Sequence, residues 1–248
     1  MKKEVVLAWG VHAFTASGII PAFFAIVFLS QENFLWAFIM LMITHFIDGV
    51  DGTLARRARV TEVLPQMSGK MMDCIIDFAT YAIIPIFAMY MAQGFWPDVS
   101  YVREGCLMLA LLVSTLYYGK EGMVSSDYYF VGFPVLWNWV AFYLYYVFGL
   151  SPWLNVTVIC VCSVLHFVPI KYVYPSRSKE LFIFNLVVFF TLVFSNIFVM
   201  LIKEGVMQGE GFLLVSRLVA MLTLLYLVVF GFYISWKKKG QDPALSES

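Results

Sequence analysis

The sequence predicts an all-α integral membrane protein with about eight transmembrane helices, on three observations. Hydrophobic residues make up 62% of the chain and charged residues only 13%, whereas about 25% of the residues in soluble domains are charged. Apolar runs close to the roughly 20 residues that span a bilayer recur along the chain. Basic residues collect in alternate connections between these runs, as the positive-inside distribution of membrane proteins requires.

The predicted spans follow one another from the N-terminus, at 11–29, 34–54, 71–92, 105–119, 131–149, 153–170, 181–201 and 212–236. The first run is longer than the apolar segment of a signal peptide, and no clear small-residue cleavage site follows it. We therefore expect it to remain as a span. The fourth run is the shortest. The polar residues after the last run predict a basic anchor and a disordered cytoplasmic tail over 237–248.

The distribution of basic residues predicts the orientation. Eight spans place both termini on one side of the membrane. If that side is the cytoplasm, every Lys and Arg lies in a cytoplasmic segment except Arg103, Lys203 and Arg217. This asymmetry predicts cytoplasmic termini and places the connection between the second and third spans in the cytoplasm.

Aspartates lie inside the second and third apolar runs, where an ionised carboxylate costs about 2.5–3.5 kcal/mol. Asp48 and Asp51 are three residues apart, and Asp73 and Asp77 are four apart, so each pair lies on one face of a helix. Two such helices packed together would gather carboxylate oxygens. Hard divalent cations such as Mg2+ or Mn2+ take oxygen ligands and often complete their coordination with substrate phosphates. We predict a divalent-metal site for a phosphate-bearing substrate, facing the cytoplasm.

Small residues and an arginine separate the two aspartate pairs. Gly52, Ala55 and Gly69 allow a bound molecule to approach the helix backbone closely, and Arg56 carries a planar guanidinium suited to phosphate oxygens. The whole run has the form D-x2-D-G-x2-A-R-x12-G-x3-D-x3-D. A cation-coupled transporter with carboxylates in its cavity is the alternative. It accounts for the aspartates but not for the residues between them.

This run resembles the signature of the CDP-alcohol phosphotransferase family at every fixed position. The resemblance implies a transferase that displaces CMP from a CDP-linked donor, a six-helix core with two further helices here, and a homodimer. It implies one transmembrane catalytic domain over residues 1–236. It also implies that Asp48, Asp51, Asp73 and Asp77 bind metal, that Asp77 is the general base, and that the CDP-binding residues are Asp51, Gly52, Ala55, Arg56 and Gly69.

Two segments outside the signature, VHAFTASG at 11–18 and SSDYYFVGFPVLWNW at 125–139, resemble the bacterial phosphatidylcholine synthase branch of that family. Members of this branch join CDP-diacylglycerol to free choline. The resemblance implies these two substrates, a bacterial inner membrane and contact with membrane lipids; no nucleic acid is expected as a partner. Phosphatidylserine synthase and phosphatidylglycerophosphate synthase are the alternatives within the family.

Aromatic and acidic residues are dense between the fourth and fifth predicted spans. A quaternary ammonium cannot donate a hydrogen bond, so aromatic faces and carboxylates hold it. The choline-binding candidates are Tyr118, Glu121, Asp127, Tyr128, Trp137 and Asn138, with Trp139 beside them. An aromatic belt at the membrane interface is the alternative, although a belt does not need the two acids.

Polar residues of the first two spans are also expected near the aspartates. His45 lies one turn before Asp48, where it either orients a ligand carboxylate or is a buried structural histidine. His12, Thr15 and Ser17 are expected to face the site near the start of the first span, and helix packing is the alternative for the threonine and the serine.

Overall fold

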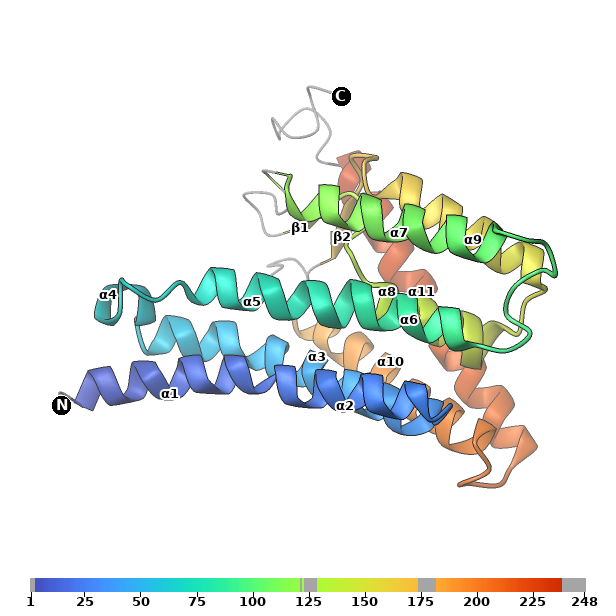
Figure 1. The fold of residues 1–248 in the computed structure, drawn as a ribbon, viewed down its shortest axis with the longest axis horizontal. Coiled ribbons are helices and arrows are strands. Elements are labelled where there is room, and N and C mark those ends of the chain that lie inside the picture. Colours follow the sequence, from blue (N-terminus) through green and yellow to red (C-terminus); the bar gives the residue numbers. More distant parts are fainter. Residues whose placement is uncertain (1–2, 121, 123–128, 174–181, 238–248) are drawn as a thin grey trace. The chain divides into compact units, whose positions relative to one another are not determined.

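The computed structural model describes residues 3–120, 122, 129–173 and 182–237 (Figure 1). Each of the eight predicted apolar segments contains a helix, so the all-α prediction is confirmed. Five helical stretches are long and apolar enough to cross a membrane, at Lys3–Ser30, Phe34–Arg57, Gly69–Met91, Ile183–Lys203 and Glu210–Tyr233. The helices of the remaining three segments are shorter, among them the apolar helix Pro152–Leu165.

The chain forms two compact units, and the first consists of Met1–Ala92 with Leu136–Ala141. In this unit α3 packs against both α1 and α2, while α5 packs on α1 and α6 on α2 (Figure 1). A short π-helical segment, η1, joins α5 to α6. The elements are α1 (Lys3–Ser17), α2 (Ile19–Ser30), α3 (Phe34–Arg57), α4 (Val60–Val63), α5 (Gly69–Asp77), η1 (Phe78–Ile83), α6 (Ile84–Met91) and α8 (Trp137–Phe142) up to Ala141.

Local sequence signals fix the helix starts and the close packing in this unit. The side chain of Asn33 accepts a hydrogen bond from the Trp36 amide at 3.2 Å and caps α3, and Ser68 does the same for Met71 at the start of α5. Gly18 joins α1 to α2. A Cβ there would lie 3.2 Å from the Thr15 carbonyl oxygen and in ordinary contact, at 3.4–3.6 Å, with the side chains of Ile76 and Ile47, so this position is closely surrounded by α1, α3 and α5.

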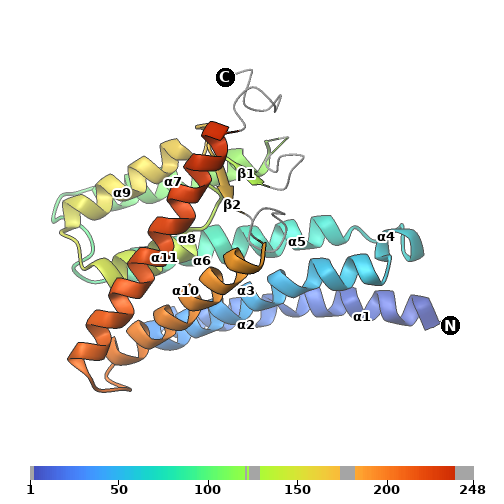
Figure 2. The ribbon, with the colours of Figure 1, turned by 180° about the vertical axis from the view of Figure 1, so that it is seen from behind.

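The second unit consists of Gln93–Val135 with Phe142–Ser248. In it α7 packs on α9, and α10 packs on α11 and on the π-helical segment η2 (Figure 2). A two-stranded antiparallel sheet, in which Phe130 pairs with Tyr172, lies against α11 through β2. The elements are α7 (Val102–Tyr118), β1 (Tyr129–Val131), η2 (Tyr143–Phe148), α9 (Pro152–Leu165), β2 (Lys171–Val173), α10 (Phe182–Lys203) and α11 (Glu210–Lys237).

The fifth predicted span is shorter than expected. The apolar run 131–149 begins in β1, and its helix starts only at Trp137. Gly132 has a φ of +88°, which a helix cannot accommodate, and Pro134 has no N–H to donate to a preceding turn. The amides of Gly132 and Phe133 bond instead to the carbonyls of Ile170 and Leu165, at 2.9 and 2.8 Å.

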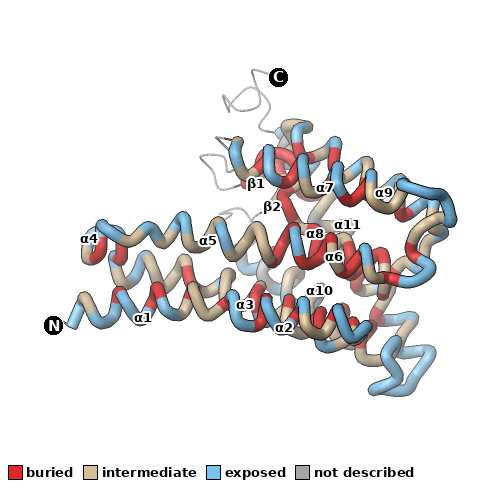
Figure 3. The backbone as a smooth tube through the Cα atoms, viewed as in Figure 1, coloured by how far each residue is buried: buried red, intermediate tan, exposed pale blue. Residues whose placement is uncertain are grey.

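Large apolar side chains are exposed on both units, and the buried residues include aliphatic, aromatic and small side chains. Figure 3 marks the buried and exposed stretches along the backbone. Phe46 in the first unit is 67% exposed, and Leu222 in the second is 64% exposed. Such exposure is unfavourable in water and is the expected state of side chains that face lipid. The exposed apolar surface therefore agrees with the span assignments in identifying a multi-pass membrane protein.

Replacing Gly132 with alanine should destabilise the second unit, because a Cβ there would overlap the carbonyl oxygen of His166. Gly149→Ala is the matched control, since Gly149 also has positive φ but open space around it. We expect a cost of about 1–2 kcal/mol for Gly149→Ala from the backbone conformation alone, and roughly twice that or more for Gly132→Ala. Thermal unfolding in detergent measures both. Equal losses would show that the loop relaxes freely around position 132.

Candidate active site

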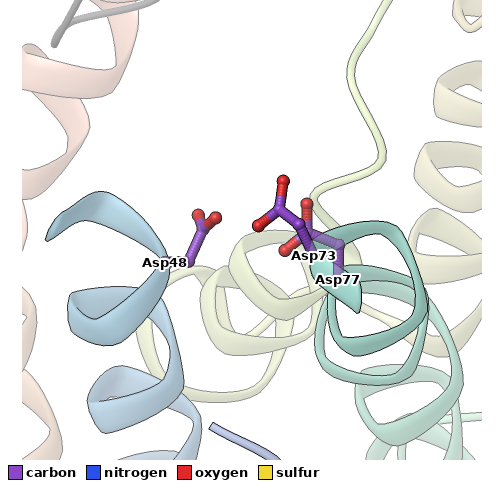
Figure 4. Close-up of side chains that lie close together, drawn as sticks. All are labelled: Asp48, Asp73 and Asp77. Atoms are coloured by element: carbon purple, nitrogen blue, oxygen red, sulfur yellow. The ribbon is translucent and has the colours of Figure 1, made fainter. Parts of the chain in front are cut away.

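Three of the four aspartates come together between α3 and α5. Each of Asp48, Asp73 and Asp77 offers a carboxylate oxygen, and these oxygens all lie within 4.8 Å of one another. Figure 4 shows Asp48 on α3 and the other two carboxylates on α5. All three residues are half-buried. The predicted convergence of the two helices is therefore confirmed for these three side chains.

Helix geometry explains this arrangement. The Ser68 cap starts α5 at Gly69, so Asp73 and Asp77 occupy successive turns on one face. Asp48 lies on α3, which packs against both α5 and η1. Asp77 is consequently within electrostatic range of three other carboxylates, those of Asp48, Asp73 and Asp51. Like charges at this spacing repel strongly in a low-dielectric surrounding, so the cluster needs positive charge to be stable.

The donor set fits a hard divalent cation. The three ligands are all carboxylate oxygens, with no histidine or cysteine among them, and this composition suits Mg2+ or Mn2+ rather than Zn2+ or Cu2+. Within the described part of the chain, no other set of three or more acidic, histidine or cysteine side chains has this geometry. Asp48, Asp73 and Asp77 would hold the ion.

Asp51 lies beside this group and has partners of its own. It is only 5% exposed; the Thr15 hydroxyl and the Gly52 backbone amide donate to its carboxylate, and Arg56 is near enough to interact with its charge. The expectation that Thr15 faces the motif is therefore confirmed. A fourth-ligand role for Asp51 stays a prediction.

The other signature residues surround the aspartates in different ways. The Arg56 guanidinium is exposed and donates to the Thr53 hydroxyl at 3.0 Å, with further N–H groups left for a ligand. Gly69 lies against His12, whose ring carbon Cε1 would be 3.2 Å from a Cβ at that position. Ala55 packs against a core cluster of Ala8, Val11, Val60 and Leu64.

A tyrosine that the sequence analysis did not single out contacts the cluster directly. The Tyr81 hydroxyl donates to Asp48 Oδ2 at 2.7 Å, and the same hydroxyl lies 2.6 Å from His45 Nδ1. His45 thus reaches Asp48 through Tyr81. A sequence signal for Tyr81 exists, because it continues the four-residue spacing of Asp73 and Asp77.

The choline-binding candidates are distributed over the chain. Trp137 and Asn138 are buried in α8, and Trp139 packs edge-on against His45 with ring centroids 5.5 Å apart. Tyr118 ends α7 in the second unit. Glu121, Asp127 and Tyr128 lie outside the described residues. Trp139 thus contacts a residue that lies one turn from Asp48 on α3.

Comparison with known proteins identifies the family. A family model described as CDP-alcohol phosphatidyltransferase matches residues 11–168, a region that contains the complete aspartate signature. The chain belongs to the CDP-alcohol phosphatidyltransferase family. The family resemblance of the signature is thereby confirmed.

Curated members of the family named phosphatidylcholine synthase are similar to this CDP-alcohol phosphatidyltransferase over most of its length. The protein of Rhizobium johnstonii is 40% identical over 74% of this chain and 74% of its own. The protein of Pseudomonas aeruginosa is 37% identical over 76% of this chain and 78% of its own. The protein of Borreliella burgdorferi is 31% identical over 96% and 98% of the two chains.

Removing a single carboxylate should abolish cation binding by this CDP-alcohol phosphatidyltransferase. We expect Asp48→Asn and Asp73→Asn each to weaken Mn2+ binding by at least about 100-fold, because each substitution removes a charged ligand. Release of CMP should fall with it, and EDTA should inhibit the unchanged protein reversibly. Asp98→Asn, at an exposed position outside the cluster, is the control. Isothermal titration in detergent measures binding, and unchanged Mn2+ affinity in both variants would contradict the site.

Proposed function

We propose that the protein is a phosphatidylcholine synthase that condenses CDP-diacylglycerol with choline and releases CMP. The observation that carries the proposal is the carboxylate group of Asp48, Asp73 and Asp77, within 4.8 Å of one another, in a chain of this family. The names of the relatives support the choice of donor and acceptor. The reaction forms one phosphorus–oxygen bond to choline and breaks the phosphorus–oxygen bond to CMP.

The residues of the signature bind and orient the donor. Mg2+ or Mn2+ held by the carboxylates would neutralise the charge that develops on the pyrophosphate as CMP departs. Arg56, exposed beside Asp51, donates hydrogen bonds to phosphate oxygens. Gly52 on α3 and Gly69 at the start of α5 belong, with Asp51 and Ala55, to the proposed CDP-binding set.

Asp77 accepts the proton of the attacking alcohol. The choline hydroxyl oxygen attacks the phosphorus that carries diacylglycerol, its proton passes to the Asp77 carboxylate, and the bonding electrons of the broken bond leave with CMP. A general base must lie within hydrogen-bond reach of the hydroxyl. Asp77 is the last residue of α5 and adjoins the other carboxylates, so a phosphate held there lies beside it.

Trp139 is the best-placed ring to hold the trimethylammonium group of choline. It contacts His45, which lies one turn from Asp48 on α3, and both residues belong to the first unit. A ring face attracts a quaternary ammonium by about 0.5–2 kcal/mol. Choline binding by Tyr118, Trp137, Asn138, Glu121, Asp127 and Tyr128 stays a prediction from the sequence.

We further propose a bacterial inner-membrane location with both termini and the active site in the cytoplasm, and a homodimeric assembly in which residues 1–236 act as one catalytic domain. The concentration of Lys and Arg in the predicted cytoplasmic segments supports the orientation. It also places the carboxylates on the side where choline and CMP are dissolved. The dimer rests on the family resemblance.

Asp77→Asn tests the proposed base. With Mn2+ at a concentration that saturates the variant, this substitution should lower the single-turnover rate by about 10²–10⁴-fold, the usual contribution of general acid–base catalysis, while CDP-diacylglycerol still binds. Rapid-quench measurement of CMP release, together with a separate donor-binding titration, distinguishes the two effects. A variant that loses donor binding but keeps its single-turnover rate would assign Asp77 to donor binding alone.

An acceptor screen tests the proposed function. Purified protein with labelled CDP-diacylglycerol should form product with choline in preference to serine, glycerol phosphate and inositol. Trp139→Ala should raise the choline KM by roughly three- to thirty-fold, since about 1.4 kcal/mol corresponds to a factor of ten. The KM for CDP-diacylglycerol should change little. Trp153→Ala, at a half-exposed position on α9, is the control.

Two outcomes of the screen would contradict the proposal in different ways. Equal use of serine or glycerol phosphate would assign the protein to another member of the family. Absence of CMP release with any acceptor, in detergent and with Mn2+ present, would contradict the transferase itself.

A further inference from the structure

We propose that Tyr81 is a positioning residue for the cation site, and that His45 acts through it. The Tyr81 hydroxyl fixes the orientation of the Asp48 carboxylate so that its second oxygen is directed to the ion. The inference rests on the proposed function only in treating Asp48 as a metal ligand.

The contacts form a continuous chain within the first unit. Tyr81 is 5% exposed, and its hydroxyl is 2.7 Å from Asp48 Oδ2 and 2.6 Å from His45 Nδ1. The rings of His45 and Tyr81 meet edge-on with centroids 5.6 Å apart. His45 also makes a T-shaped contact with Trp139, with ring centroids 5.5 Å apart. The imidazole therefore contacts two aromatic rings.

Proton counting assigns the direction of each hydrogen bond. A carboxylate that binds a cation is ionised and can only accept, so the single hydroxyl proton of Tyr81 points to Asp48. The tyrosine oxygen must then accept from His45, which requires the proton on Nδ1. A histidine in this tautomer holds the tyrosine hydroxyl in the orientation that serves the carboxylate.

The Asp48 carboxylate depends more on a hydrogen bond that fixes its orientation than the carboxylates of Asp73 and Asp77 do. Asp73 and Asp77 share α5 and project from successive turns of one helix, whereas Asp48 is the one ligand of this group on α3. Hydrogen bonds to the outer oxygen of a ligand carboxylate fix its orientation, and losing them typically costs 10–100-fold in metal affinity. The Tyr81 hydroxyl supplies such a hydrogen bond at Oδ2.

The backbone at Tyr81 is also unusual. The segment η1, Phe78–Ile83, begins immediately after Asp77 and is π-helical. Single π turns in α-helices are rare and occur frequently at functional sites. This turn contains the residue that links the carboxylate of α3 to the helix carrying the other two ligands.

Cation binding to the purified full-length protein in detergent tests the inference without relying on turnover. Mn2+ affinity is measured from the electron paramagnetic resonance signal of free Mn2+. Tyr81→Phe removes one hydroxyl and should weaken binding by about tenfold or more. Tyr90→Phe, at a more exposed position on α6, removes the same group away from the site and should bind Mn2+ as the unchanged protein does.

Substitutions at His45 separate positioning from packing. The amide nitrogen of His45→Asn can replace the Nδ1 donor, whereas His45→Leu, of similar size, cannot. Both remove the ring contact with Trp139. We expect weakened Mn2+ binding for His45→Leu and largely restored binding for His45→Asn.

A double substitution tests whether His45 and Tyr81 act through one hydrogen-bond network. If His45 acts through Tyr81, adding His45→Leu to Tyr81→Phe should cause little further loss, because groups in one hydrogen-bond network are not additive. Independent packing roles would give losses that add. Thermal unfolding in the presence of EDTA checks that each variant is folded before cation is added.

The possible results lead to distinct conclusions. Mn2+ affinity of Tyr81→Phe equal to that of the unchanged protein, or equal losses for His45→Leu and His45→Asn, would overturn the positioning role. If Tyr81→Phe does not fold, the comparison of Mn2+ affinity between His45→Leu and His45→Asn decides the question. Failure of the unchanged protein to use choline, with Mn2+ affinity still dependent on Tyr81, would refute the proposed function and leave this inference standing.

Discussion

The structure of the first unit depends on how negative charge is accommodated beside the hydrocarbon region of a membrane. Asp48, Asp73 and Asp77 place carboxylate oxygens within 4.8 Å of one another, and Asp51 is near enough to add to their repulsion. Carboxylates in such surroundings are costly unless a cation compensates them. A divalent ion resolves this conflict, and the same ion prepares the site for an anionic pyrophosphate. The mutual repulsion of these carboxylates therefore also explains the affinity that we expect for the cation and the substrate.

Contacts among the surrounding helices position the aspartate side chains. Ser68 caps α5 and fixes the residue at which it begins, Gly18 is closely surrounded by α1, α3 and α5, and Thr15 interacts with Asp51. Each of these contacts lies within the first unit, and none of these residues belongs to the aspartate signature. A signature of fixed spacing is therefore insufficient by itself; it needs helices that begin at the correct residue and pack closely enough for the carboxylates to meet.

Much of this could be predicted from the sequence, because apolar runs and helical spacing are local properties. The eight helical segments follow from hydropathy, and the meeting of Asp48 with Asp73 and Asp77 follows from pairs that share a helix face. The strand pair of Phe130 and Tyr172 was missed, since such pairing joins residues far apart in the sequence. Tyr81 was missed because its role depends on the π turn of η1 and on His45 from another helix. Hydropathy detects neither feature.

The position of a bound cation tests the central claim most directly. Anomalous scattering from crystals grown with Mn2+ locates the ion without reference to activity. We predict a peak between α3 and α5 at coordination distance, about 2.0–2.3 Å, from carboxylate oxygens of Asp48, Asp73 and Asp77. A well-ordered cluster with no peak in Mn2+-saturated crystals, or a peak only at other residues, would contradict the assignment of these aspartates as the metal site.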